Sequence, residues 1–397
     1  MKYDIIIIGA GIIGLATGLK FLEKNPNLKI LLLEKENGIA KHQTGNNSGV
    51  IHSGIYYKPG SMKARNCING YNQLLEFCAK NDIKFDICGK LIVAVKEKEI
   101  LYLEKLFERG IENGLKGLQK LTREELKDFE PNVNGVAGIF VPQTGIIDFL
   151  EVSKKYCEVI QNYGVDINLN EEVIGIQVAT DSCEVISKNK SYQTKKVVSC
   201  AGLFSDRIAK MTHPDLNLRI IPFRGEYYKI KAERKHLVKN LIYPVPDPNF
   251  PFLGVHFTRT INDEVEAGPN AVLAFHREGY KKSDINVKDT WETFTWPGFL
   301  SIAKEYWRMG FGEFYRSYFK TAFVHALQKL IPEITKEDLE RGGSGVRAQA
   351  CDKSGGLLDD FFIVGNDRIH HVCNAPSPAA TASLSIGEYI AEKILTN

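Results

Sequence analysis

Three glycines and one carboxylate near the start of the chain have the spacing of a dinucleotide-binding turn. Gly9-Ala10-Gly11-Ile12-Ile13-Gly14 follows the apolar residues 4–8, and Glu34 ends the next apolar run. The first glycine allows a tight turn, the second lets the backbone approach a pyrophosphate, and the third lets helix and strand pack closely. Free N–H groups in the first helical turn then attract the phosphates. Glu34 can accept hydrogen bonds from ribose hydroxyls and would repel a 2′-phosphate, which argues against NADP.

Two further segments favour FAD over NAD. Residues 42–57 are dense in small, hydroxyl and amide side chains, which let the main chain approach a flat polar ring system. Residues 197–202 form an apolar run that meets a glycine and could return the chain to the cofactor. An NAD-dependent two-domain dehydrogenase is the alternative. The FAD contacts that we expect outside the glycine turn include Lys35, Thr44, Asn47, Ser48, Gly49, Val173, Ala201 and Gly202.

A discontinuous α/β domain must hold these segments together. Strand–helix patterns of the Rossmann type occur at the start, middle and end of the 397 residues, with β-rich segments between them. We therefore predict a Rossmann-like FAD-binding domain formed by 1–80, 147–212 and 341–397. An interleaved substrate domain, rich in antiparallel β structure, would comprise 81–146 and 213–340.

The composition excludes several classes of protein. Lys plus Arg total 51 and Asp plus Glu 48, without a long basic block, so nucleic-acid binding has no support. Apolar runs fall short of the ~20 residues that span a bilayer. The eight cysteines are scattered and form no C-x-x-C pair, so we expect reduced thiols and no bound metal. The N-terminus shows no targeting segment, and we predict a cytoplasmic protein.

Five separated blocks carry a family resemblance: residues 42–57, 88–95, 251–258, 268–275 and 374–381. With the glycine turn, they resemble the FAD-dependent oxidoreductases of the D-amino-acid oxidase superfamily, over nearly the whole chain. Within it, they are most similar to the L-2-hydroxyglutarate dehydrogenase/oxidase family. The resemblance implies a Rossmann-like FAD domain and oxidation of a 2-hydroxy dicarboxylate to a 2-oxo acid.

The same resemblance leaves the electron acceptor open between a membrane quinone, another carrier and oxygen. One alternative is a flavoenzyme of the same fold that oxidises glycerol 3-phosphate or an amino acid. Another is a flavin-binding sensor module without turnover. No His or Cys lies where a covalent link to the flavin is compelling, so we expect non-covalent FAD.

The predicted reaction needs a proton acceptor and cations that bind carboxylates. His256, in the block 251–258, is the best candidate for the base, with a satisfied core histidine as the alternative. His52, within 42–57, is its leading substitute. Arg347, in the glycine-rich segment 343–347, is the best carboxylate ligand. Tyr56 and Tyr57 either line the pocket or pack in the core.

The C-terminal segment is predicted to return to the flavin. Gly345 lies in the glycine-rich approach to it. Pro378, Ala379, Ala380 and Thr381 precede or begin a predicted helix over 379–395. The N–H groups of its first turn would stabilise negative charge on the N1–C2=O edge of the flavin ring.

The predicted helical segment 291–330 of the substrate domain is rich in aromatic residues. Residues 291–323 contain 12 aromatic side chains in 33 positions, with Lys304 and Arg308 among them. Gly310 and Gly312 are expected to break it into two short helices. Trp and Tyr beside basic residues suit a bilayer interface, which would place the protein peripherally on the cytoplasmic face of the inner membrane and near a quinone. The alternative is a lid or subunit contact.

Overall fold

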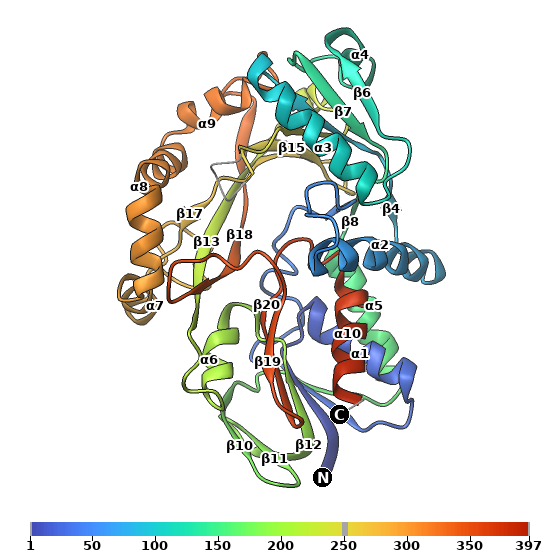
Figure 1. Ribbon diagram of the computed structural model, residues 1–397, viewed down its shortest axis with the longest axis vertical. Coiled ribbons are helices and arrows are strands. Elements are labelled where there is room, and N and C mark those ends of the chain that lie inside the picture. The colour runs from blue at the N-terminus through green and yellow to red at the C-terminus, as the bar shows by residue number, and fades with distance from the viewer. Residues whose placement is uncertain (1, 248–252, 396–397) are drawn as a thin grey trace.

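The computed structural model describes residues 2–247 and 253–395 and is organised by two large sheets (Figure 1). The first has eight strands, in the order β10-β11-β12-β1-β2-β9, with β20 beside β12 and β19 beside β20. Its central strands β2, β1, β12 and β20 are parallel. The strands are β1 (Lys2–Ile8), β2 (Ile30–Leu33), β9 (Asp166–Asn168), β10 (Val173–Val178), β11 (Cys183–Ser187), β12 (Ser191–Ser199), β19 (Phe362–Gly365) and β20 (Ile369–Asn374).

Helices cover this parallel sheet, as expected for strands buried on both faces. They are α1 (Ile12–Lys24), α2 (Met62–Lys80), α5 (Phe149–Asn162), α6 (Ser205–Lys210) and α10 (Ser383–Leu395). Leu15 of α1, Tyr156 of α5 and Ile390 of α10 share one buried core with Ile5 and Ile7 of β1. In Figure 1, α1, α5 and α10 lie together beside the sheet.

The second sheet has nine strands and is mostly antiparallel. Its order is β17-β13-β16-β15-β14-β5-β7-β6, with β18 paired to β13. Phe257 and Val93 lie in its buried core with Phe323 of a covering helix. The strands are β5 (Lys90–Ala94), β6 (Gln119–Thr122), β7 (Ala137–Val141), β13 (Leu218–Ile230), β14 (Leu241–Pro244), β15 (His256–Arg259), β16 (Val265–Gly268), β17 (Val272–Leu273) and β18 (Leu339–Asp352).

The remaining elements connect or flank the sheets. A three-stranded sheet in the order β3-β8-β4 contains β3 (Val50–Ile51), β4 (Phe85–Asp86) and β8 (Gly145–Ile147). The flanking helices are α3 (Ile100–Glu112), α4 (Arg123–Phe129), α7 (Val287–Phe294), α8 (Pro297–Tyr318) and α9 (Lys320–Leu327). Short 3₁₀ helices are η1 (Glu97–Glu99), η2 (Gly202–Phe204) and η3 (Ala232–Leu237). In the described ranges, no helix is both long and apolar enough to cross a membrane.

The predicted fold class is confirmed, but three local predictions differ from the structure. Residues 341–352, predicted to belong to the FAD domain, lie in β18 and pair with β13 of the nine-stranded sheet. Helix α8 continues through Gly310 and Gly312, because interior glycines cost a helix only about 1 kcal/mol each. Its kink lies instead at Tyr306 (φ −108°, ψ 16°).

The third difference concerns the start of the last helix. Residues 378–382 form turns, and α10 begins at Ser383 rather than at Ala379. The N–H of Ala379 donates to the carbonyl of Pro376, and that of Ala382 donates to Pro378. Some backbone donors that we had expected to face the flavin are therefore used within these turns.

Candidate active site

The glycine turn between β1 and α1 has the geometry expected for holding phosphates. Gly9 has φ +104°, and a Cβ there would lie 2.6 Å from the carbonyl oxygen of Cys200. A Cβ on Gly14 would lie 2.0 Å from the carbonyl oxygen of Gly9. Gly11 caps α1 without a side-chain hydrogen bond. The turn thus combines close backbone packing with a helix N-terminus that can receive an anion.

Glu34 lies directly beside this turn. Its buried carboxylate accepts hydrogen bonds from the N–H groups of Ala10 (2.7 Å) and Glu36 (3.0 Å). Each carboxylate oxygen has a second lone pair with which it can accept a ribose hydroxyl. The N–H of Glu171 donates to the carbonyl of Glu34, which brings the start of β10 at Val173 toward the same edge.

Segments far apart in sequence converge on the turn. The N–H of Ile12 donates to Thr44 Oγ1 (3.1 Å), and the N–H of Cys200, before Ala201, donates to Ile8 (2.8 Å). Gly202 (φ +50°) approaches Gln43, and a Cβ on Gly345 would lie 2.2 Å from the carbonyl oxygen of Asn46. Residues 44, 200, 202 and 345 thus bring distant parts of the chain close to the glycine turn or to residues 43–46.

The predicted flavin segment 42–57 is joined to the C-terminal turns. The N–H of His52 donates to Thr381 Oγ1 (3.1 Å), and the Thr381 hydroxyl donates to the carbonyl of Val50 (3.4 Å). Asn47 Oδ1 accepts from the N–H of Gly49, with the half-buried Ser48 between them. Thr381 therefore contacts the predicted flavin segment 42–57, although it lies before the start of α10.

His256 lies on β15 with one ring nitrogen engaged. Its Nδ1 is 2.9 Å from the carbonyl oxygen of Gly254, and its ring packs on Tyr243 with centroids 3.9 Å apart. A carbonyl only accepts, so Nδ1 carries the proton and Nε2 keeps its lone pair. Burial, with Arg347 and Lys90 nearby, lowers the pKa of His256 to about 3. In its block, Pro251 and Phe252 lie outside the described residues.

His52 is also held in its neutral form. Desolvation, aided by the positive charges of Lys90, His256 and Lys63, lowers its pKa to about 3. Each of the two imidazoles senses the charge of Lys90, which places the three groups in one electrostatic environment. The structure thus brings together the two histidines that the sequence had singled out.

Sequence reasoning missed Lys90, which begins β5. The residue is 1% exposed, and its ammonium lies over the rings of Tyr56 (4.4 Å to the centroid) and Tyr243 (4.9 Å). Desolvation lowers the pKa of Lys90 to about 7. The sequence did contain a signal, because Lys90 is a lone lysine at the start of the apolar run 90–95. A lysine is almost never fully buried in a strand unless its ammonium is paired.

Arg347 lies on β18 with its guanidinium over Gly225. Its Nη1 donates to the carbonyl of Asn270 (3.4 Å), and desolvation lowers its pKa. Three other arginines lie in ion pairs: Arg224 with Glu226, Arg259 with Asp86, and Arg277 with Asp206.

Tyr56 and Tyr57 lie at the end of the flavin segment. The Tyr56 hydroxyl is buried, and among the described residues it has no hydrogen-bond partner. Arg109 Nη1 donates to the Tyr56 carbonyl, and the Tyr57 ring packs under the ammonium of Lys63. Burial raises the pKa of both phenols, so they are neutral donors. A cavity of about 340 Å³ between α3, β6 and β7 contains neither residue and lies apart from this chemistry.

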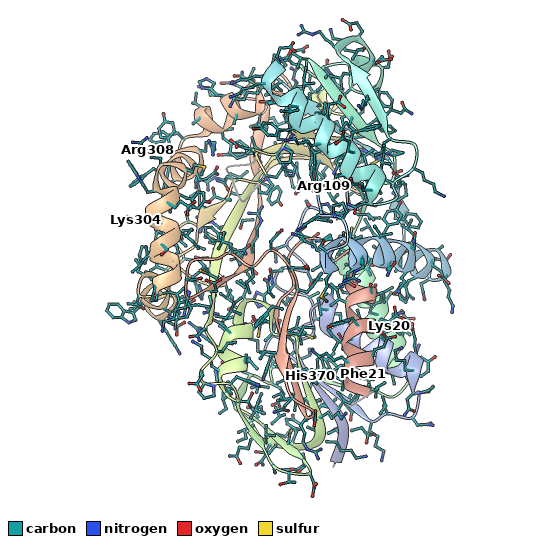
Figure 2. All side chains as sticks on the ribbon, viewed as in Figure 1. Lys20, Phe21, Arg109, Lys304, Arg308 and His370 are labelled. Atoms are coloured by element: carbon teal, nitrogen blue, oxygen red, sulfur yellow. The ribbon has the colours of Figure 1, made fainter. Side chains whose placement is uncertain are left out.

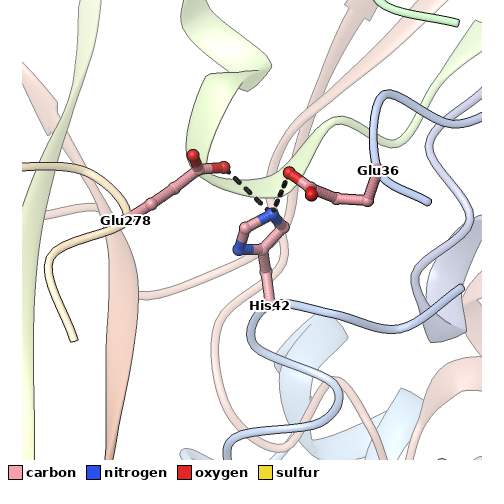
Figure 3. Close-up of side chains that lie close together, drawn as sticks. All are labelled: Glu36, His42 and Glu278. Atoms are coloured by element: carbon pink, nitrogen blue, oxygen red, sulfur yellow. Dashed lines mark hydrogen bonds and ion pairs between the residues drawn. The ribbon is translucent and has the colours of Figure 1, made fainter. Parts of the chain in front are cut away.

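A second polar cluster, Glu36, His42 and Glu278, lies near the glycine turn (Figure 3). His42 Nε2 is 3.0 Å from Glu36 Oε1 and 2.9 Å from Glu278 Oε1. The Lys35 ammonium forms ion pairs with both carboxylates. Although burial opposes it, hydrogen bonds from His42 and Lys35 lower the pKa of Glu278 to about 2. The charges are therefore balanced by a lysine, and Lys35, predicted to contact FAD, directs its ammonium to this junction.

The fold and the converging turns define a dinucleotide-binding oxidoreductase of the type that holds FAD. Residues 4–393 match the family described as FAD dependent oxidoreductase, and the chain belongs to that family. It is an enzyme whose cofactor is FAD, as the resemblance implied. The uncapped start of α1 and the Glu34 carboxylate fit the pyrophosphate and ribose of this cofactor.

Relatives with known names are similar over almost the whole chain. The L-2-hydroxyglutarate dehydrogenase of Indibacter alkaliphilus is 57% identical over 393 residues, covering 99% of this chain and 98% of that protein. The mitochondrial L-2-hydroxyglutarate dehydrogenase of Homo sapiens is 45% identical and covers 99% and 89%.

Among solved structures, the FAD-bound L-alpha-glycerophosphate oxidase of Mycoplasma pneumoniae superposes with a TM-score of 0.80 at 24% identity, covering 100% of this chain and 95% of the other. These structural similarities concern the fold.

Proposed function

We propose that this enzyme oxidises L-2-hydroxyglutarate to 2-oxoglutarate. The observation that carries the proposal is the 57% identity, over 99% of the chain, to a relative named L-2-hydroxyglutarate dehydrogenase. The side chains of the site suit the reaction, because neutral His256 and His52 lie in the same electrostatic environment as the cations Lys90 and Arg347. An anionic substrate is favoured in such a site.

The reaction removes a hydride from C2 and a proton from the hydroxyl, so that the C–O bond becomes a carbonyl. Bound FAD supplies the two-electron acceptor for the hydride. In the proposed mechanism, His256 Nε2 accepts the hydroxyl proton, and the bond from Nδ1 to Gly254 fixes the tautomer and the ring. Arg347 binds a carboxylate, and its planar guanidinium can do so through two hydrogen bonds. The buried Tyr56 hydroxyl donates a further hydrogen bond to the substrate.

Anaerobic flavin reduction tests the proposal. The purified enzyme is mixed with L-2-hydroxyglutarate, its D enantiomer, glycerol 3-phosphate or glycine, and the visible flavin absorbance is followed. We expect bleaching with the L enantiomer only. Bleaching by glycerol 3-phosphate or glycine alone would assign the enzyme to another substrate class. A yellow protein that no compound reduces would favour the sensor alternative.

We also propose that electrons leave to a quinone at an anionic membrane surface that the aromatic helices contact. Trp291 (71% exposed) and Phe311 (70%) present apolar side chains on α7 and α8, as do Trp307, Tyr315 and Phe319 nearby. Lys304 and Arg308 lie on the outer edge of α8 beside them (Figure 2). Amphipathic aromatic side chains with interleaved cations favour the interfacial region of anionic bilayers. This surface supports peripheral binding without a spanning helix.

Co-sedimentation with anionic liposomes at low salt tests this part of the proposal. A variant with Trp307→Ala and Phe311→Ala should lose most binding while its flavin is reduced by substrate at the normal rate. Leu101→Ala is a matched control, because Leu101 is 62% exposed on the distant helix α3. If the unmodified enzyme ignored the liposomes, a soluble carrier or oxygen would become the preferred acceptor.

A further inference from the structure

Within residues 2–247 and 253–395, the buried lysine at the start of β5 has no acidic partner. No described residue accepts a hydrogen bond from Lys90 or forms an ion pair with it; its ammonium lies over the rings of Tyr56 and Tyr243. An isolated buried ammonium is costly, and proteins usually pair it or keep it out of the core. Retaining such a group is physically reasonable where an anion from solution completes the pair.

The lysine faces the same site as His256. Lys90 and Ile92 lie on one face of β5, and Ile92 pairs with Tyr243 of β14. The Tyr243 ring packs against His256, and the Lys90 ammonium lies over the same ring. On the flavin side, the N–H of Gly89 donates to Thr144, whose hydroxyl donates to Ser53 next to His52.

The strand order places the two cations on opposite sides of His256. Across the sheet, the order is β18-β13-β16-β15-β14-β5, with Arg347 on β18, His256 on β15 and Lys90 on β5. At about 4.8 Å per strand, Lys90 begins about 10 Å from the His256 strand in one direction and Arg347 about 14 Å in the other. Long side chains reach back across these distances, so an anion at each end would centre the substrate on the histidine.

We propose that Lys90 binds one carboxylate of a dicarboxylate substrate, with Arg347 binding the other, and so selects dicarboxylic over monocarboxylic 2-hydroxy acids. This inference rests on the proposed function and extends it by assigning the group that reads the second carboxylate. Lys90 also acts on both imidazoles, so that anion binding reduces the positive field on His256 and makes it a better proton acceptor. The groups that face Lys90 are Tyr56, Tyr243, Cys67, His52 and His256.

The test compares Lys90→Met with the unmodified holoenzyme on matched substrates. L-2-hydroxyvalerate is the same five-carbon chain with a methyl group in place of the distal carboxylate. We expect Lys90→Met to lower kcat/KM for L-2-hydroxyglutarate by about 10²–10³-fold, since removing one partner of a buried charge pair has effects of that size. We expect kcat/KM for L-2-hydroxyvalerate to stay within about threefold, because this substrate has no distal carboxylate for Lys90 to bind.

Binding provides a readout that needs no turnover. Glutarate and pentanoate, neither of which has a hydroxyl to oxidise, are titrated into the oxidised holoenzyme by calorimetry. Lys90→Met should weaken glutarate binding and leave pentanoate binding unchanged. Lys90→Gln repeats both experiments with a polar side chain, and retained flavin absorbance shows that each variant is folded. Lys120→Met is the control, because Lys120 also lies over an aromatic ring, Phe107, but on the surface and paired with Glu104.

Two outcomes would overturn the inference. If both substrates lost activity equally and glutarate bound normally, Lys90 would act on the step common to them, for example as the base. If neither kinetics nor binding changed, it would have no role at the site. Failure of the proposed function looks different, because the unmodified enzyme would then not be reduced by L-2-hydroxyglutarate.

Discussion

The two large sheets prepare their parts of the site by different means. Beside the parallel sheet, the groups predicted to hold the cofactor are mainly backbone atoms of tight turns at Gly9, Gly49 and Gly202, all with positive φ. On the antiparallel sheet, the groups proposed to act on the substrate are long side chains on separate strands: Lys90, His256 and Arg347. Backbone sites depend on the absence of a Cβ, whereas the side-chain site depends on polar groups that are buried on separate strands. The two regions should therefore respond differently to substitution.

The largest effect is expected at the glycine turn. A Cβ in Gly14→Ala would lie 2.0 Å from the Gly9 carbonyl oxygen, so the turn must open and cofactor binding should be lost. The absorbance ratio at flavin and protein wavelengths measures this loss. Gly310→Ala is the matched control, because nothing lies within 4 Å of its added Cβ and a helix gains about 0.5–1 kcal/mol from such a change. A yellow Gly14→Ala protein would contradict the backbone argument.

The next largest effect is expected at the proposed base. His256→Ala should keep its FAD and slow anaerobic flavin reduction by about 10²–10⁴-fold, the usual contribution of a general base. Stopped-flow measurement of flavin bleaching gives the rate. His325→Ala, on the exposed side of α9, should leave it unchanged. Normal reduction in His256→Ala would transfer the proposed role to His52.

A smaller effect is expected when pH changes the affinity of the enzyme for glutarate. The pKa of Lys90 is about 7 in the free enzyme, and a bound carboxylate would raise it. Below pH 7 the ammonium is already present; above pH 7 binding must take up a proton, so glutarate affinity should fall by up to about tenfold per pH unit. Calorimetry between pH 6 and pH 9 measures this as a decline from about pH 7 upward. In Lys90→Met the decline should disappear, and its persistence would assign the titration to another group.

The smallest effect is expected on stability. Lys90→Met should stabilise the folded protein, although it should lower activity on L-2-hydroxyglutarate. The pKa of Lys90 falls from 10.5 in the unfolded chain to about 7 in the folded one. The unfolded state therefore binds more protons between those values, and this residue destabilises the fold increasingly as pH drops from 10.5 to 7. Lys90→Met should raise Tm at pH 7 by a few degrees without ligand, as differential scanning calorimetry can show. A lower Tm would mean that the lysine contributes to packing.

Local patterns predicted much of the parallel sheet and its turn. The order of Gly9, Gly11, Gly14 and Glu34 was sufficient because these residues act within one β-α-β unit. The start of α10 was not predicted correctly. The backbone N–H groups after Pro378 donate to carbonyls of residues 376–380 within turns, and these turns replace the first turns of the expected helix.

The sequence by itself predicted that the chain binds FAD and that a glycine turn holds it, and it selected His256, His52 and Arg347 as candidate site residues. Only the tertiary structure decided that Lys90 lies near them, that β18 joins the antiparallel sheet, and that Lys35, predicted to contact FAD, forms an ion pair with Glu278. The physical reason is range. A turn or cap is specified by neighbours in sequence, whereas the charge state of a lysine depends on which strands, far apart in the chain, exclude water from it.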